Sequence, residues 1–399
     1  MMLLYLELMS LNAGTLMGTG NNIFYVFLVF GVALVFSLLI TPFIWKLALR
    51  LQEPKTKERF VPELGGIAIF ISFMMGLLIA ILLSPESFTK LENKLIGLVL
   101  GGTTVLLVGV YDDIRGTTCY QKFLGQVFAA LIAIYFGFKI SMLNNPFGEP
   151  IRLGYLSIPL TLLWIVGISN AINLIDGLDG LAAGVSSVTG LTMFLIATYM
   201  GNVPVMFLTA ILVGAILGFL KYNFNPAKIF MGDTGSLFLG FLLALFSIQG
   251  AYQTSTAVAI LIPIIALGVP IVDTLYAIFR RARKGINPLK GDREHIHHRL
   301  LNLGLSQKQA VMLIYGVSMM FGIIAFLLTA ANDEFTAVLL LIVGIIVFIG
   351  VRRLGYIEFT ASPPQGFVPE NEPEEVIGEG ELEEVVDYVE VEEITAEKL

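Results

Sequence analysis

Long apolar runs separated by short polar or Gly/Pro breaks recur along most of the chain. Crossing the hydrocarbon core of a bilayer takes about 20 apolar residues, and candidate runs lie near residues 23–45, 64–83, 95–111, 121–140, 156–172, 181–200, 204–222, 237–251, 256–279, 309–330 and 336–351. Only 14% of the residues are charged, against about a quarter in soluble globular proteins, which excludes an ordinary cytosolic enzyme. The sequence therefore predicts an all-α polytopic membrane protein with about eleven transmembrane helices.

The basic residues predict the orientation of these helices. If the first span runs from outside to inside, 19 Lys and Arg residues lie in inner segments, and only Lys90, Lys94, Lys139 and Arg152 lie in outer loops. Cytoplasmic loops of membrane proteins carry an excess of Lys and Arg. We therefore expect a multi-pass protein of the plasma membrane, with its N-terminus outside and its C-terminus in the cytoplasm.

The net charge of −7 comes from the C-terminal end. Residues 356–399 hold 14 of the 31 acidic residues and one of the 24 basic ones, so the rest of the chain is net positive. Such a charge run is typical of a solvated, disordered segment, with a short partner-binding strand or helix as the alternative. We expect a leader (1–22), a transmembrane catalytic domain (23–355) and a disordered cytoplasmic tail (356–399). The single cysteine, Cys119, excludes an intramolecular disulfide framework.

Apart from Asp333, the aspartates outside the tail gather at the predicted inner helix ends rather than at mid-span, where an ion pathway would place them. Asp112 and Asp113 follow the span 95–111. Adjacent carboxylates at a helix C-terminus oppose the helix dipole and each other unless a cation compensates. Mg²⁺ is suited to this position because it takes oxygen ligands and bridges carboxylates to phosphates. The alternative is a solvated turn in which Arg115 is the partner.

Two further inner loops, 173–180 and 223–236, add candidate site residues. Asp176 and Asp179 are three residues apart and would share one face if their segment were helical, although Asp179 could instead cap the next helix. Asp233 precedes a predicted helix N-terminus, which attracts anions. A carboxylate beside a phosphate favours a metal between them; a simple capping role for Asp233 is the alternative.

The inner loop 280–308 is the most basic segment and contains all three histidines. His295, His297 and His298 lie beside Arg293 and Arg299. A zinc site is one interpretation. The absence of nearby cysteines and the presence of the arginines favour a clamp for a diphosphate. Positive-inside topology with binding of anionic headgroups is the plainer alternative.

Together these stretches resemble a known family, the polyprenyl-phosphate N-acetylhexosamine-1-phosphate transferases of the glycosyltransferase 4 type. The matching segments, in the family's order, are Pro62-Glu63-Leu64-Gly65-Gly66, Gly109-Val110-Tyr111-Asp112-Asp113, residues 173–180, residues 223–236 and His295-Ile296-His297-His298-Arg299. The histidine pattern is similar to the undecaprenyl-phosphate GlcNAc-1-phosphate transferase branch. The branch that uses UDP-MurNAc-pentapeptide carries three consecutive histidines and is the alternative.

The resemblance implies a substrate set and a cofactor. The donor would be a UDP-N-acetylhexosamine such as UDP-GlcNAc, the acceptor undecaprenyl phosphate, and the products UMP and the first lipid intermediate of a cell-wall or surface polysaccharide such as teichoic acid or O-antigen. Mg²⁺, with Mn²⁺ as an alternative, would act in the reaction. Membrane lipids and a second copy in a homodimer are further implied partners, and no nucleic acid is expected.

The resemblance also implies roles for residues. Catalytic roles fall to Asp112, Asp113, Asp176 and Asp179, and metal binding to Asp233 with Asp112 and Asp113. Substrate binding falls to Lys57, Asn173, Asn223, Phe230, Arg293, His295, His297, His298 and Arg299. The segment before Pro62 is shorter than in the family, which leaves the site lysine open between Lys55 and Lys57.

Two mechanisms and a second class of protein stay open. The lipid phosphate could attack the β-phosphate directly, or an aspartate could first form a covalent phospho-sugar adduct. A phosphate monoester has a second pKa of about 6 and is largely dianionic at neutral pH, which favours direct attack. An ion-coupled secondary transporter would also be polytopic, but it predicts ionisable groups at mid-span. The CDP-alcohol phosphotransferases need an Asp-Gly-x-x-Ala-Arg motif, which the 176–179 region lacks.

Overall fold

The structure is a computed structural model that describes residues 13–52, 60–143, 151–251, 261–283, 295–330 and 333–360. The chain divides into two units, Met1–Val351 and Arg352–Leu399. The first contains a helical bundle, and of the second only the end of one helix, up to residue 360, is described. The expected tail therefore lies almost wholly outside the described residues, as does the leader up to residue 12.

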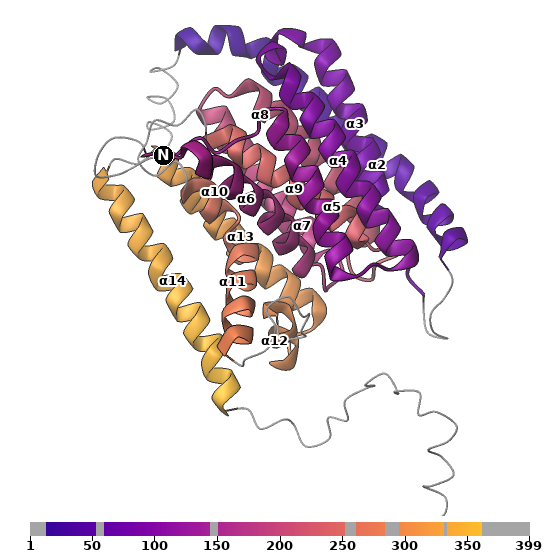
Figure 1. The fold of residues 1–399 in the computed structure, drawn as a ribbon, viewed down its shortest axis with the longest axis vertical. Helices are drawn as coiled ribbons and strands as arrows, with labels where there is room; N and C mark the ends of the chain where they lie inside the picture. The colour runs from indigo at the N-terminus through magenta and orange to yellow at the C-terminus, as the bar shows by residue number, and fades with distance from the viewer. Residues whose placement is uncertain are drawn as a thin grey trace, which may run out of the picture. The chain divides into compact units, whose positions relative to one another are not determined.

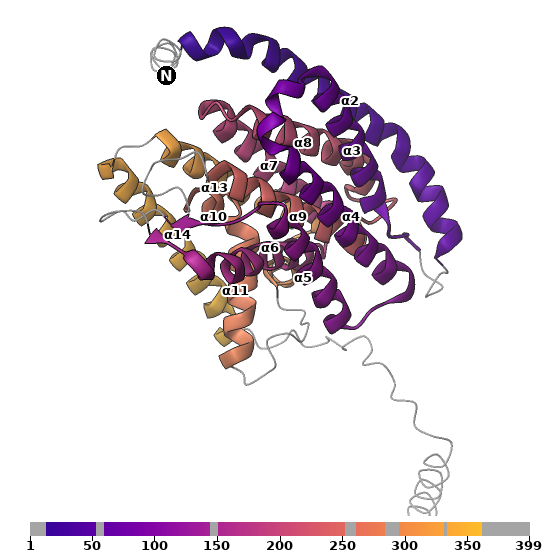
Figure 2. The same cartoon turned by 45° about the horizontal axis from the view of Figure 1, so that its top comes forward.

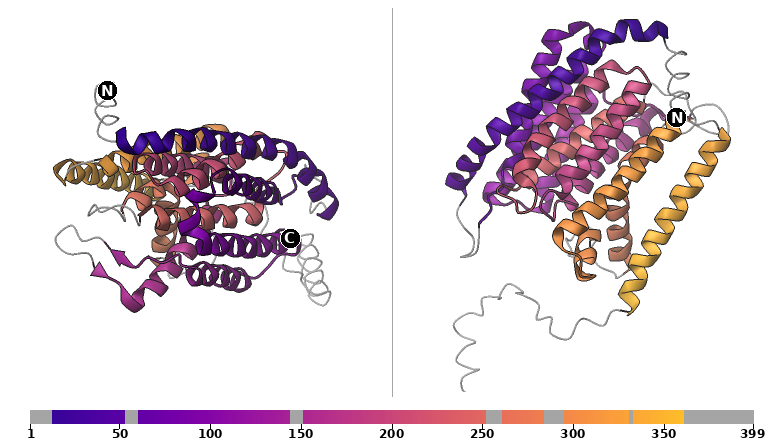
Figure 3. Two further views of the ribbon diagram at one scale, coloured as in Figure 1. Left: turned by 90° about the horizontal axis from the view of Figure 1, so that it is seen from above. Right: turned by 180° about the vertical axis from the view of Figure 1, so that it is seen from behind.

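The described residues are almost all helical. The helices are α2 (Ala13–Leu51), α3 (Gly65–Leu83), α4 (Glu92–Arg115), α5 (Cys119–Tyr135), α6 (Ser157–Leu174), α7 (Leu181–Tyr199), α8 (Val203–Asn223), α9 (Gly232–Ala251), α10 (Leu261–Ala266), α11 (Gly268–Arg283), α12 (Ile296–Asn302), α13 (Gln307–Ala330) and α14 (Asp333–Thr360), with 3₁₀ turns η1 (Pro85–Ser87), η2 (Thr89–Leu91) and η3 (Gly154–Leu156). A pair of antiparallel two-residue strands, β1 (Met142–Leu143) and β2 (Ile151–Arg152), connects α5 to α6 (Figure 3).

Eight helices in the described part of the chain are long and apolar enough to cross a membrane. This confirms the all-α polytopic class, while the number of about eleven crossings stays a prediction. α5 and the apolar part of α14 are shorter. The predicted run 256–279 is not one helix, because α10 ends before Leu267 and α11 begins after it. Pro270 has no N–H to donate to the carbonyl of Ala266, and Thr189 Oγ1 of α7 donates to that oxygen instead (3.2 Å).

Helix α9 lies at the centre of the bundle, in contact with α3, α4, α6 and α7 (Figure 1). Small residues on its neighbours permit this close packing. A Cβ on Gly101 of α4 would lie 2.5 Å from the ring of Phe241, and one on Gly240 would lie 2.5 Å from the Cα of Ser169 in α6. These contacts hold the middle of α9 closely against α4 and α6.

The long helix α2 lies along the outside of α3 and α8 (Figure 2). Gly214 and Gly218 of α8 face the backbone of α2, and a Cβ on Gly218 would lie 2.5 Å from the carbonyl oxygen of Leu34. This spacing of small residues, four apart on one helix, lets two helices approach to backbone contact. α2 and α8 thus form one wall of the bundle.

Candidate active site

The site begins at the N-terminus of α9, where a carboxylate from another helix caps the backbone. Asp113 of α4 accepts hydrogen bonds from the backbone nitrogens of Asp233 (2.9 Å) and Thr234 (3.0 Å), and from Thr234 Oγ1 (2.6 Å). The first N–H groups of a helix have no partner within it, and Asp113 satisfies two of them. Gly109 and Gly232 make room, since a Cβ on either would collide with this contact, and Gly232 has φ +69°.

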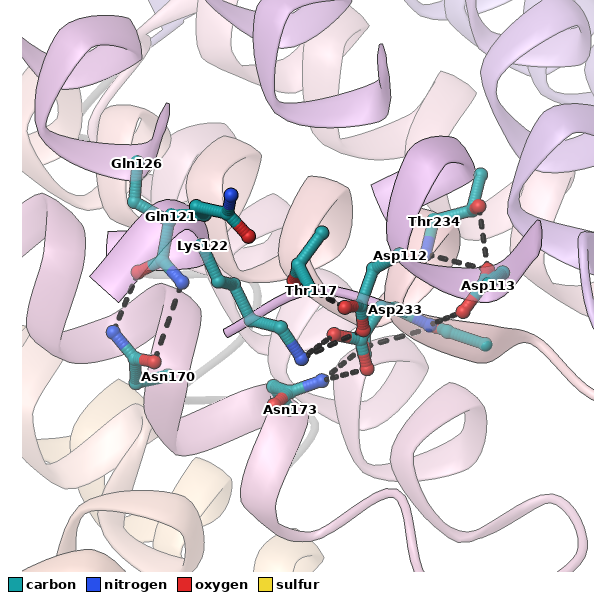
Figure 4. A network of polar contacts seen from close by, with 12 residues as sticks. Asp112, Asp113, Thr117, Gln121, Lys122, Gln126, Asn170, Asn173, Asp233 and Thr234 are labelled. Carbon is teal, nitrogen blue, oxygen red and sulfur yellow. Dashed lines mark hydrogen bonds and ion pairs between the residues drawn. The ribbon is translucent and has the colours of Figure 1, made fainter. Parts of the chain in front are cut away.

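A lysine bridges the other two carboxylates of this region (Figure 4). Lys122 of α5 lies with its Nζ 2.8 Å from Asp112 Oδ2 and also forms an ion pair with Asp233 Oδ2. Asn173 Nδ2 donates to Asp233 Oδ1 (2.8 Å), and Thr117 Oγ1 donates to Asp112. Sequence reasoning used Lys122 only for topology. The sequence did offer a signal for its role, because Lys122 lies in the first turn of the helix that follows Asp112 and Asp113.

An amide pair joins α5, the helix that carries Lys122, to α6. One turn along α5, Gln126 Oε1 accepts from Asn170 Nδ2 (2.5 Å), and Gln126 Nε2 donates to Asn170 Oδ1 (3.3 Å). Gln126 is buried, and Asn170 satisfies its side-chain amide in place of water. Figure 4 shows this pair on the far side of Lys122 from Asp113.

Three carboxylates can converge on one cation. Ligand oxygens of Asp112, Asp113 and Asp233 all lie within 4.8 Å of one another. Hard oxygen donors of this kind are suited to Mg²⁺. Among the described residues, these three carboxylates lie close enough together to hold a metal ion. The described histidines do not form such a group. The geometry brings together the three residues predicted as metal ligands.

A cavity of about 620 Å³ opens beside this cluster. Its volume is in the range of small-molecule sites. Most of its lining is polar and comes from helix ends and the loops between them: Glu63, Asp112, Asp113, Gly116, Thr117, Lys122, Asn173, Asp176, Gly177, Leu178, Asp179, Asn223, Phe230, Gly232 and Asp233. Predicted site residues of three separate motifs therefore share one cavity, and Glu63 of a fourth motif also lines it.

The loop 175–180 between α6 and α7 is a series of turns and not a helix. Asp179 does not cap α7, since Gly180 occupies that position without a side-chain hydrogen bond. Its Oδ2 instead accepts from Asn225 Nδ2 (3.1 Å) and the backbone nitrogen of Ala227 (2.9 Å), which ties this loop to the next. Burial, and the negative charges of neighbouring acids, raise the pKa of Asp176 well above its usual value.

Backbone pairing joins the first and fourth motifs. The nitrogen of Phe230 donates to the carbonyl of Pro62 (2.8 Å), and the nitrogen of Gly66 donates to the carbonyl of Met231 (3.0 Å). A Cβ on Gly66 would collide with the backbone nitrogen of Gly235, so this crossing requires glycine. Asn223 is buried and donates through Nδ2 to the carbonyl of Ile229 (3.0 Å). These contacts fix the position of the part of the cavity wall that contains Asn223 and Phe230.

The histidine helix α12 docks on the loop 175–180 from outside the cavity. A Cβ on Gly177 would collide with the ring of His297, which shows how closely the two pack. The rings of His295 and His298 also lie close to that ring, at 5.9 Å and 4.2 Å between centroids. Burial lowers the pKa of His297 to about 4, with the charge of His298 adding to the effect. At neutral pH its ring is uncharged, so the positive charge of an anion clamp must come from other groups.

Two predicted substrate residues cannot be placed. Lys57, its alternative Lys55, and Arg293 lie outside the described residues. Arg299 is placed in α12, where its guanidinium stacks 4.9 Å from the ring centre of Tyr276 and its Nη1 donates to that hydroxyl (3.2 Å). The substrate-binding roles of Lys57, Arg293 and Arg299 therefore remain predictions.

The chain is similar to several known proteins. The model of glycosyl transferase family 4 matches residues 95–251, which run from α4 to the end of α9. The "Probable undecaprenyl-phosphate N-acetylglucosaminyl 1-phosphate transferase" of Bacillus subtilis is 41% identical over 76% of this chain and 85% of its own length. The "Decaprenyl-phosphate N-acetylglucosaminephosphotransferase" of Mycolicibacterium smegmatis is 39% identical over 66% of this chain and 70% of its own. The "Phospho-N-acetylmuramoyl-pentapeptide-transferase" of Shouchella clausii is 34% identical over 75% and 95%.

Proposed function

The chain belongs to glycosyl transferase family 4, and from this premise we propose that it transfers N-acetylglucosamine 1-phosphate from UDP-GlcNAc to undecaprenyl phosphate and releases UMP. The observation that carries the proposal is the cavity beside the Asp112, Asp113 and Asp233 cluster. The cluster, and all of the cavity lining except Glu63, lie within the region that the family model matches. The names of the Bacillus and Mycolicibacterium relatives supply the sugar and the polyprenyl class of acceptor.

In the proposed reaction a phosphate oxygen of the lipid attacks the β-phosphorus of the donor. A new O–P bond forms, the bridging bond between the α- and β-phosphates breaks, and its electron pair leaves on UMP. The acceptor phosphate, with a second pKa of about 6, needs little help from a base. Asp112 therefore orients the acceptor in direct attack rather than activating it. Mg²⁺ held by Asp233, Asp112 and Asp113 would neutralise the charge that develops on the diphosphate.

The residues around the cluster have distinct parts in this scheme. Lys122, between Asp112 and Asp233, places one positive charge at the wall of the cavity, where a phosphate oxygen can accept from its ammonium. Asp113 holds the N-terminus of α9, and Asn173 holds Asp233. Asp176, Asp179, Asn223 and Phe230 line the remaining wall and would face the nucleotide and sugar. We assign Lys57, Arg293, Arg299 and the three histidines to the sugar diphosphate.

The proposed setting is the cytoplasmic face of the plasma membrane. The loops that form the cavity lie at the ends of α2, α4, α6 and α8, where the excess of basic residues places the cytoplasm. With α5, the pair α10–α11, and α14 counted as crossings, the chain would cross eleven times, N-terminus outside. We further propose a homodimer, on the family resemblance.

The sugar is tested by incubating purified protein with undecaprenyl phosphate, Mg²⁺ and one UDP-sugar at a time, and following UMP. UDP-GlcNAc should support release, and chelation of Mg²⁺ should stop it. The pentapeptide alternative is less favoured because the Shouchella relative is less similar and 295–299 is His-Ile-His-His-Arg. Release of UMP from UDP-MurNAc-pentapeptide but not from UDP-GlcNAc would overturn the assignment.

A further inference from the structure

A buried carboxylate in α11 that the proposed reaction does not use anchors the histidine helix. Asp273 is 2% exposed. Its Oδ2 lies 2.9 Å from His295 Nδ1, and its Oδ1 accepts from the backbone nitrogen of Ile296 (2.9 Å). An ionised carboxylate can only accept hydrogen bonds. The contact therefore requires that Nδ1 of His295 carry the proton.

The same face of α11 makes a second contact with α12. Tyr276, one turn after Asp273, stacks under the guanidinium of Arg299 and accepts a hydrogen bond from it. α12 is only 7 residues long, and helices this short are not stable by themselves. Its orientation must therefore be imposed by its neighbours: Asp273 holds its first turn, Tyr276 contacts it further along, and α13 packs against it.

This anchoring extends to the cavity. His297 of α12 packs against Gly177, in the loop whose Asp176 and Asp179 line the cavity. A shift of α12 would displace both the histidine rings and the backbone of that loop. Asp273 is thus linked to the reacting groups by two packed contacts, although it does not line the cavity itself.

We propose that Asp273 is a positioning residue that acts through His295. It holds the imidazole as the Nδ1–H tautomer and sets α12 against the loop 175–180. This inference rests on the proposed function, since His295 is taken to bind the sugar diphosphate. In an Asp273→Asn variant the amide can still accept from Ile296, but its NH₂ group would face Nδ1. The imidazole would then favour the opposite tautomer without a change in side-chain volume.

The kinetic test is a double-variant cycle. We expect Asp273→Asn to lower kcat/KM for UDP-GlcNAc at least tenfold, and to lower it less than twofold when His295 is already alanine, because the two act as one unit. Thr274→Val is the matched control: the buried Thr274 Oγ1 has no hydrogen-bond partner, so activity should stay at the wild-type level. Full activity of Asp273→Asn, or losses that multiply in the double variant, would overturn the proposal.

A spectroscopic test decides the same point without turnover. The chain has three histidines, so ¹⁵N-histidine labelling yields three rings, and His295→Ala assigns one of them. At pH 8 that ring should be protonated on Nδ1 in the wild type and on Nε2 in Asp273→Asn. A wild-type ring protonated on Nε2 would contradict the anchoring. Absence of UMP release from every UDP-sugar would instead refute the proposed function, and the spectrum would still decide the role of Asp273.

Discussion

Asp112 and Asp113 are neighbours in the chain but occupy different surroundings. Asp113 is 8% exposed, and both its oxygens accept hydrogen bonds from the first turn of α9. Asp112 lies in the cavity wall, paired with Lys122 and Thr117. Asp113 therefore holds the first turn of α9 in addition to its proposed part in the metal site, whereas Asp112 carries no such structural contact with α9.

This difference predicts opposite results for two conservative variants. Asp113→Asn turns an NH₂ group toward backbone donors and should lower the free energy of unfolding by roughly 1–3 kcal/mol. Asp112→Asn should unfold like the wild type and bind UDP-GlcNAc with Mg²⁺, yet lose most turnover. Thermal unfolding in detergent and UMP release measure the two effects. Turnover retained by Asp112→Asn would remove this residue from the chemistry.

The low pKa of His297 predicts a pH dependence of stability. The unfolded histidine binds a proton below pH about 6.5, whereas burial holds the folded one neutral down to about pH 4. The unfolded state therefore binds more protons as the pH falls, and the free energy of unfolding should drop by about 2 kcal/mol between pH 7 and pH 5. The contribution is fully present above pH 7.

Thermal unfolding of the wild type and of His297→Gln across pH 5 to 8 isolates this contribution. The glutamine variant lacks the titrating ring, so the stability difference between the two proteins should shrink as the pH falls. A difference that is constant with pH would show that His297 is not held neutral.

At the scale of helices, the crossing of α3 and α9 depends on the absence of side chains. Gly66→Ala places a methyl group against the backbone of Gly235, and relieving this collision would require α3 or α9 to move. We expect the variant to lose most activity and to unfold at a clearly lower temperature. Gly167→Ala in α6 is the control, because nothing lies within 4 Å of its Cβ position, and helix propensity slightly favours the alanine. Equal behaviour of the two variants would contradict the close packing.

The sequence predicted helices and motifs better than it predicted pairings between them. Apolar runs, and acidic residues at the inner ends of helices, can be recognised in the sequence itself. The class of fold and the clustering of the motifs at one end of the bundle could therefore be predicted. Lys122 and Asp273 were placed at the inner face, but their pairings with Asp233 and His295 were not predicted because these partners are distant in the chain. The break at Leu267 also depends on a tertiary contact, since Thr189 of α7 satisfies the carbonyl that Pro270 cannot.

At the scale of the whole molecule, the orientation can be tested with native and introduced cysteines. Cys119 is the single cysteine and is exposed at the start of α5, beside the motif loops. A membrane-impermeant maleimide should label it only after cells are permeabilised. In a Cys119→Ser background, Tyr155→Cys in η3, 98% exposed at the opposite ends of α5 and α6, should be labelled in intact cells. The reverse pattern would place the cavity outside the cytoplasm.

The central claim is that a phosphate group moves together with the sugar, and donor labelled with ³²P at its β-phosphate tests it most directly. Purified protein with undecaprenyl phosphate, Mg²⁺ and this UDP-GlcNAc should move the label into the organic-extractable lipid while unlabelled UMP is released, and Asp112→Asn should not. Label that leaves as UDP while only the sugar reaches the lipid, or label that never reaches the lipid at all, would contradict the account.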